Sequence, residues 1–251
     1  MMVNNYKLNG HIFIEIPEGI SCLGSDEFDP YSSDKEKPLQ EVFISTFWIS
    51  KYPTTVLQFY NYLRSVNKDL PRSWGRVNEK GIPLLLEKYE NYPVTNISWE
   101  MASDYCKWLS NLSGKNVVLP TEAEWEKAAR GGEARIWPWG DFFDASFCNS
   151  IESGRQGICS IFEYEKGASP YGVMHMAGNV WEWCSDFWHP ISHNDIKFIN
   201  PINYKPSGRR VVKGGSAFCS KEVIRPACRD WTNSVNQGGG DDGFRVAIRL
   251  F

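Results

Sequence analysis

The sequence predicts an α+β fold, on three observations. Alternating apolar residues indicate strands near both ends of the 251-residue chain. Segments with helical period and capping residues lie between them, and residues 131–236 are rich in Gly, Pro, Ser and Trp without that period. Such long loops in a folded protein are usually functional, and their aromatic content argues that they are ordered. No linker or repeat interrupts the chain, so we expect one domain over residues 1–251.

Strands are predicted near the two ends. The segment HIFIEIP at residues 11–17 alternates isoleucine with other residues, as a half-buried strand does. The segment at 40–53 continues this pattern, and 244–250 alternates Phe, Val, Ile and Leu with smaller or charged residues. Because a terminal strand usually joins the sheet, we expect the two ends of the chain to be neighbours.

Three helices are predicted from their caps. Thr55 is followed three residues later by Gln58, and Thr121 by Glu124, which is the spacing of a capping box. Ser98 can cap a third segment with an apolar face. The predicted helices cover residues 56–66, 99–112 and 124–130, and a Gly-Gly pair ends the last of them.

Composition excludes several classes of function. The net charge of −3 offers no electrostatic attraction to nucleic acid. No apolar run approaches the roughly 18 residues of a membrane span, and the first residues lack a signal-peptide pattern, so we expect a cytoplasmic protein. Seven cysteines without a zinc-binding spacing indicate reduced thiols. Eleven Trp residues are many for this length, and some of their rings should frame a surface or a pocket.

Several phrases occur together in the order LPTEAEWEKAARGG, MAGNVWEWCSDFW, RVVKGGSAFC and GFRVAIRL. In this order they resemble the formylglycine-generating, sulfatase-modifying family over roughly residues 12–251. The resemblance implies an α+β fold of the C-type lectin-like type. The family's enzymes oxidise a peptide cysteine to formylglycine, with O2 and a Cu(I) ion held by two cysteine thiolates. Soft thiolates suit Cu(I), so this chemistry needs both.

The resemblance places the first active-site cysteine at Cys219 and the neighbouring serine at Ser216. The second cysteine should follow five residues later, where this chain has Ile224. Cys228 lies nearby, and the sequence leaves open whether it substitutes. A single thiolate beside an isoleucine is a poor copper site, so we expect Cys219 to be a partly buried neutral thiol and copper to be absent.

Calcium is the family's other ion. The resemblance maps two carbonyl ligands onto Gly178 and Val180, the carboxylate onto Glu182, and the first ligand onto His175. Calcium takes oxygen ligands, so an imidazole weakens the expected structural site. The alternative is that Glu182 pairs within the core. For a second family calcium site only Asn149 and Ser150 align, and we do not expect that site.

Two other sets of residues have the composition of a disulfide or of an iron site. Some secreted family members have a disulfide whose first position matches Cys106, but its partner position is Val246, which supports a reducing compartment. His189 and His193 with Asp186 or Asp195 could suit non-haem iron, yet Pro190 prevents a helix that would align the imidazoles, and exposed loop histidines are the favoured interpretation.

Residues 217–242 lie between two framework phrases and combine small polar residues with aromatic ones, as antibody paratopes do. The resembled family includes non-catalytic members, among them variable ligand-binding proteins of diversity-generating retroelements. The first hypothesis is therefore a non-oxidising member that presents a surface to a protein or small-molecule ligand. The alternative is a copper-dependent oxidoreductase that uses Cys219. The predicted contact residues are Phe218, Asp230, Trp231, Asn233, Asn236, Asp242, Trp181 and Trp188.

Overall fold

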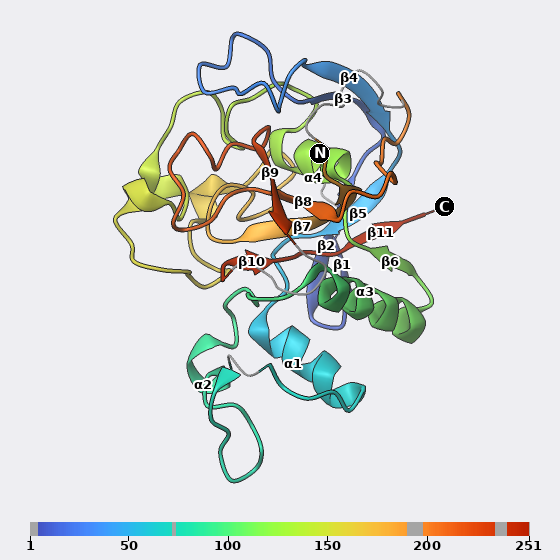
Figure 1. Ribbon diagram of the computed structural model, residues 1–251, viewed down its shortest axis with the longest axis vertical. Helices are drawn as coiled ribbons and strands as arrows, with labels where there is room; N and C mark the ends of the chain where they lie inside the picture. The colour runs from blue at the N-terminus through green and yellow to red at the C-terminus, as the bar shows by residue number, and fades with distance from the viewer. Residues whose placement is uncertain (1–4, 72–73, 190–197, 234–239, 251) are drawn as a thin grey trace.

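A five-stranded antiparallel sheet contains strands from both ends of the sequence (Figure 1). The computed structural model describes residues 5–71, 74–189, 198–233 and 240–250. In spatial order the strands are β1 (Asn5–Leu8), β2 (His11–Ile16), β5 (Phe47–Ser50), β11 (Ala247–Arg249) and β6 (Asn116–Val118). The two ends of the chain therefore share a sheet, as expected, but β5 separates β11 from β2.

The segment predicted as a strand at 40–53 contains two. β4 (Gln40–Ile44) pairs with β3 (Gly19–Leu23) in a separate two-stranded sheet. The chain then leaves that sheet at Ser45, whose N–H donates to the Asn200 side chain instead of to a strand neighbour. It enters β5 of the large sheet two residues later.

A second, four-stranded sheet has the order β10-β7-β8-β9. Its strands are β7 (Trp181–Phe187), β8 (Arg209–Lys213), β9 (Arg229–Asn233) and the short β10 (Asp242–Gly243). Three of these strands lie in the region that the sequence predicts as loops. The other described residues of that region are irregular apart from three single-turn 3-10 helices, η2 (Ala145–Phe147), η3 (Ile151–Ser153) and η4 (Glu165–Gly167).

The three predicted helices are confirmed, together with their caps. They are α1 (Val56–Ser65), α3 (Trp99–Ser113) and α4 (Glu122–Arg130), and a single turn, α2 (Leu86–Tyr89), was not predicted. Thr55 and Thr121 each form the complete capping box, and the Ser98 hydroxyl accepts the N–H of Met101. Satisfying these N–H groups defines where each helix begins.

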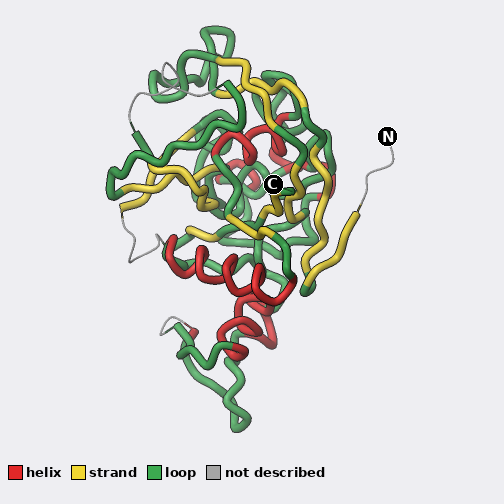
Figure 2. The backbone as a smooth tube through the Cα atoms, turned by 90° about the vertical axis from the view of Figure 1, so that its right-hand side faces the viewer, coloured by secondary structure: helices red, strands yellow, loops and turns green. Residues whose placement is uncertain are grey.

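Side chains alternate between the two faces of the five-stranded sheet. On β2, Phe13 joins a core with α1 and α3, whereas Ile14 and Ile16 join a second core with α4. On β11, Ile248 joins the core with α1 and α3, and Ala247 joins the core with α4. Period-two alternation thus gives the sheet two buried faces. The helices accordingly fall into two groups, and in Figure 1 α1 and α3 lie below the strands of this sheet and α4 above them. Figure 2 shows the same two groups of helices from the side.

None of the helices in the described part of the chain is long and apolar enough to span a membrane.

Candidate functional site

The segment Ser216–Ile224, called here the Cys219 loop, follows a Gly-Gly turn at the end of β8. Gly214 and Gly215 both have positive φ, +91° and +67°. A Cβ on Gly214 would lie 3.0 Å from the Trp125 ring, and one on Gly215 would lie 2.8 Å from Ile224. Only glycine fits both the conformation and the space, so this turn sets where the loop starts.

The Cys219 thiol is partly exposed and lies 3.6 Å from the hydroxyl of Ser216, which is itself buried. The Cys219 N–H donates to the Ser216 carbonyl at 3.1 Å, and its carbonyl accepts the N–H of Ile151. These bonds form a tight turn that holds the thiol against a small cluster of buried apolar residues. The cluster consists of Trp137, Cys148, Ala177 and Ile224.

The side chain at the family's second cysteine position, Ile224, is fully buried in that cluster. No second sulfur therefore faces Cys219 from this position. Cys228 is a poor substitute as it stands, because burial raises the pKa of its thiol to about 12 and keeps it protonated. The residues present do not fit a two-thiolate copper site at Cys219 and Ile224.

Exposed apolar side chains surround the Cys219 loop. Phe218, on the loop itself, is 60% exposed, and Ile151, whose N–H bonds to Cys219, is 59% exposed. The Lys221 ammonium lies over the rings of Tyr31 and Phe143, at 5.6 and 6.0 Å. The loop thus presents apolar and cationic groups to solvent above a fixed backbone.

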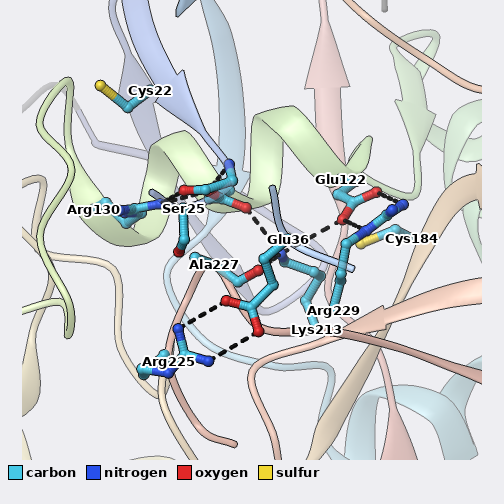
Figure 3. A network of polar contacts seen from close by, with 12 residues as sticks. Cys22, Ser25, Glu36, Glu122, Arg130, Cys184, Lys213, Arg225, Ala227 and Arg229 are labelled. Atoms are coloured by element: carbon cyan, nitrogen blue, oxygen red, sulfur yellow. Dashed lines mark hydrogen bonds and ion pairs between the residues drawn. The ribbon is translucent and has the colours of Figure 1, made fainter. Parts of the chain in front are cut away.

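A network of buried charges holds this loop from beneath (Figure 3). The Arg225 guanidinium donates to both oxygens of Glu36 at 2.8 and 2.9 Å, to Asp29 at 2.5 Å and to the Tyr31 carbonyl at 2.9 Å. Arg225 directly follows Ile224, so these bonds join the Cys219 loop to the distant segment 24–37. These contacts were not predicted, although an arginine within the largely apolar stretch VIRPAC was a weak signal.

The same network continues into α4 and β8. Lys213 is fully buried, and its ammonium lies 2.9 Å from Glu126 and 3.6 Å from Glu122. The Arg229 guanidinium donates to both carboxylate oxygens of Glu122, at 2.7 and 2.8 Å. Glu126 also pairs with Arg130 at 2.7 Å. Buried charges are tolerated only when paired, and here each one has an opposite partner.

The predicted contact residues do not form one surface. Asp230 and Trp231 are partly exposed on β9, whereas Asp242 and Trp181 lie on β10 and β7, beyond β8. Asp242 is 2% and Trp188 6% exposed, so both side chains lie in the interior and offer little surface to a ligand. Trp181 packs against the core shared with α1 and α3. Asn236 lies outside the described residues, as does the side chain of Asn233.

Two of the predicted rings do meet. Trp231 and Trp188 have centroids 5.7 Å apart, and the Arg209 guanidinium lies 3.8 Å over the Trp231 ring. The Trp188 ring is buried, while Trp231 remains partly exposed at the edge of the four-stranded sheet. The tilted Trp188 ring and the Arg209 guanidinium together fix the orientation of the Trp231 ring.

The residues aligned with the calcium site have other partners. The Glu182 carboxylate is fully buried and accepts bonds from Trp125 Nε1 at 2.7 Å and from Arg245 at 2.5 and 2.7 Å. His175 Nε2 lies 3.0 Å from the Ile161 carbonyl, to which it donates, and burial lowers the pKa of this imidazole to about 4. A carboxylate already neutralised by a guanidinium, beside a donating imidazole, does not fit a calcium ion.

The backbone groups of Gly178 and Val180, the two expected carbonyl ligands, make hydrogen bonds near the Gly214 turn. The Gly178 N–H donates to the Gly214 carbonyl at 2.7 Å, and its carbonyl accepts the N–H of Val180. A Cβ on Gly178 would lie 2.3 Å from the Asn149 carbonyl oxygen, so the glycine is required for close packing. Of the pair aligned with a second calcium site, Asn149 donates to the Gly157 carbonyl and to Asn179, and Ser150 donates to Glu152.

The remaining candidates are also accounted for. All seven cysteines are free thiols, Cys106 among them. Asp186, weighed as an iron ligand, is buried and accepts the N–H groups of Glu122 and Asn203, while His189 Nε2 lies 2.8 Å from the Lys205 carbonyl. His193 and Asp195 fall outside the described residues. Within the described ranges no group of three or more His, Cys, Asp or Glu side chains could hold a metal ion.

Comparison with known proteins supports the sequence-based resemblance. Residues 2–250 match the sulfatase-modifying factor enzyme 1-like domain. The chain is 36% identical to the formylglycine-generating enzyme of Mus musculus over 287 aligned positions, which cover 93% of this chain and 74% of that enzyme.

Two solved structures share the fold. PvdO from Pseudomonas aeruginosa has a TM-score of 0.83 at 23% identity, covering 98% of both chains. The Treponema denticola variable protein 1 has a TM-score of 0.77 at 20% identity, covering 99% of both. These similarities confirm the predicted α+β, C-type lectin-like fold.

Proposed function

The chain belongs to the sulfatase-modifying factor enzyme 1-like family, and from that premise we propose that it is a non-oxidising member that binds a ligand at the Cys219 loop. The observation that carries the proposal is the fully buried side chain of Ile224 where the family's enzymes have their second copper-binding cysteine. An apolar side chain packed into a cluster cannot ligate a metal, and one thiol cannot complete the site.

The exposed groups of the loop suit binding. Phe218 supplies a large ring with few rotatable bonds, and Ile151 extends the apolar area beside it. The Arg225 network fixes the backbone beneath, so little conformational entropy is lost when a ligand binds. Trp231, supported by Trp188 and Arg209, offers a second contact on β9. We propose a protein or small molecule as the ligand.

The Treponema denticola protein of the same fold is named a variable protein. The fold can therefore carry a diversified surface, which agrees with the mixture of polar and aromatic residues at 217–242 in this chain. We propose that this interval is such a surface. A diversity-generating retroelement beside the gene, with a template copy encoding this interval, is the genetic observation expected.

The alternative function is a copper-dependent oxidoreductase in which Cys219 ligates Cu(I) with a rearranged Cys228. A competition titration of Cu(I) against a chromophoric chelator separates the two, using wild type, Cys219→Ala and Ile224→Cys. We expect tight binding only in Ile224→Cys, since that change supplies the missing thiol. Tight binding by the wild type that disappears in Cys219→Ala, together with conversion of a sulfatase-motif peptide under O2, would disprove the non-oxidising proposal.

The binding half of the proposal needs its own experiment. Peptides selected from a displayed library on the wild-type protein are titrated against Phe218→Ala and Trp231→Ala. The matched control is Phe142→Ala, which removes a ring that is 89% exposed. Loss of binding of about tenfold or more is expected in the first two variants and not in the control. Equal binding by all three variants would show that neither the Cys219 loop nor β9 is the binding surface.

A further inference from the structure

A pocket of about 340 Å³ lies apart from the Cys219 loop, where the turn between β1 and β2 meets the start of α1. The end of β5 and two distant segments, around Asn91 and Phe162, complete its walls. Figure 1 shows the β1–β2 hairpin and α1 at the same end of the molecule. Neither the family resemblance nor the proposed surface assigns a role to this pocket.

The walls of the pocket are fixed before any ligand arrives. Gly10 has φ +80°, and a Cβ there would lie 3.5 Å from Gln58 Nε2, so the turn packs directly on that amide. Gln58 Oε1 accepts the Thr55 N–H at 2.8 Å in the capping box, which orients the side chain and leaves Nε2 toward the turn. His11 Nε2 lies 2.8 Å from the Tyr105 hydroxyl. A pocket held in this way loses little entropy on binding.

The lining combines apolar side chains with polar groups that carry no formal charge. Four carboxamide side chains contribute to it, from Asn9, Gln58, Asn61 and Asn91. None of the described residues that line it bears a carboxylate, an ammonium or a guanidinium group, and burial lowers the pKa of His11 to about 3, so its imidazole is neutral. Charged groups of both signs contact the lining from outside, Lys51 over the Tyr52 ring and Glu90 bonded to Asn91, so an ionic ligand would lose hydration here without gaining a net opposite charge. Gln58 Oε1 and Asn91 Nδ2 already have partners, so a purely apolar ligand would leave chiefly the Asn61 carboxamide unpaired.

An aromatic pair borders the same pocket. Phe162 is 56% exposed and meets Tyr52 edge to face, with centroids 5.6 Å apart. The Ile161 N–H donates to the Asn91 carbonyl at 3.0 Å, which holds the backbone on the N-terminal side of Phe162 to the opposite wall. The exposed ring face is available to a flat apolar surface on a ligand.

From these features we propose that the pocket binds a neutral pyranose sugar. Each sugar hydroxyl both donates and accepts, so it can pair with the Asn61 carboxamide and with the amide atoms of Gln58 and Asn91 that internal hydrogen bonds leave free. The C–H face of the ring packs on Phe162, which gives the apolar contact that a wholly polar ligand would lack. The inference does not depend on the proposed function of the Cys219 loop.

The test titrates the full chain with methyl glycosides of glucose, galactose, mannose and N-acetylglucosamine, followed by ligand-observed NMR. Binding of at least one sugar in the millimolar range is expected. Phe162→Ala and Asn61→Leu each weaken it about tenfold, because one loses the ring and the other an amide. Both positions are exposed, so the variants should fold, as unchanged circular dichroism would verify.

Phe218→Ala and Phe142→Ala are the matched controls and should leave sugar binding unchanged. Binding lost in Phe218→Ala would place the sugar at the Cys219 loop and overturn the assignment of this pocket. The proposal also fails if no sugar binds, if both pocket variants bind as the wild type does, or if glucuronate binds as tightly as glucose.

Discussion

Replacing Arg225 by Met should destabilise the protein strongly, because it leaves two carboxylates buried without their cation. Glu36 is 1% and Asp29 9% exposed, and the guanidinium donates to both. Breaking a buried ion pair by removing one partner costs about 3–5 kcal/mol. Lys213 still attracts Glu36, so we expect a loss of about 3–4 kcal/mol at neutral pH.

The pH dependence distinguishes this cause from lost packing. Burial alone would raise the pKa of Glu36, but the hydrogen bonds and charge of Arg225 outweigh it, and the pKa lies below its ordinary value. That contribution to stability is present above the unfolded-state pKa and is lost as pH falls through the folded-state pKa. Without Arg225 burial dominates and the pKa rises, so the folded variant takes up a proton that the unfolded chain does not.

The deficit should therefore shrink as the pH falls from about 7 to about 5. Urea unfolding, followed by tryptophan fluorescence at both pH values, measures it. The double variant Arg225→Met/Glu36→Gln is the control and should be more stable than Arg225→Met alone at neutral pH. A deficit below about 1 kcal/mol, or one equal at both pH values, would refute the assignment of a buried charge network.

Three further predictions follow from contacts described above. Gly178→Ala should lower the free energy of unfolding by about 2–5 kcal/mol or prevent folding, because its Cβ would meet the Asn149 carbonyl. Gly154 also has a positive φ, +70°, but faces open space, so Gly154→Ala is the control and should cost only about 1–2 kcal/mol in urea unfolding. Burial and, after it, the charge of Glu122 raise the pKa of Asp186 to about 7, so ionisation of this group destabilises the fold increasingly from about pH 4 to 7. Asp186→Asn should therefore make the melting temperature less dependent on pH over that range, and an unchanged pH dependence would contradict this reasoning. Neither millimolar calcium nor a chelator should shift the melting temperature, because Glu182 already pairs with Arg245; a clear rise with calcium would restore the family's ion site.

The elements that local chemistry determines were predictable from the sequence. The caps at Thr55, Ser98 and Thr121 identified three helices because a capping side chain and its N–H target lie three residues apart. The strands in the region 131–236 were missed. β7 is buried on both faces over much of its length and so lacks the alternation that identifies a half-buried strand.

For the candidate site, too, some residues could be predicted from the sequence and others could not. Cys219, Ser216 and Ile224 were located through the family resemblance, because the phrase RVVKGGSAFC aligns with the family's active-site segment. The partners of Arg225 were not, because Glu36 lies 189 positions away and no local pattern reports so distant a contact. Burial of Asp242 and Trp188 was missed for the same reason: it depends on which strands become neighbours.

The place of β11 between β5 and β6 has a consequence for synthesis in the cell. On the ribosome β2 and β5 emerge long before residues 247–249, and until then β5 is paired on one edge only, with β2, while β6 has no partner strand. Pairings between such distant segments form slowly, and unpaired strand edges promote aggregation. The edge of β5 that β11 covers in the folded protein is therefore open to wrong pairing until residues 247–249 have left the exit tunnel.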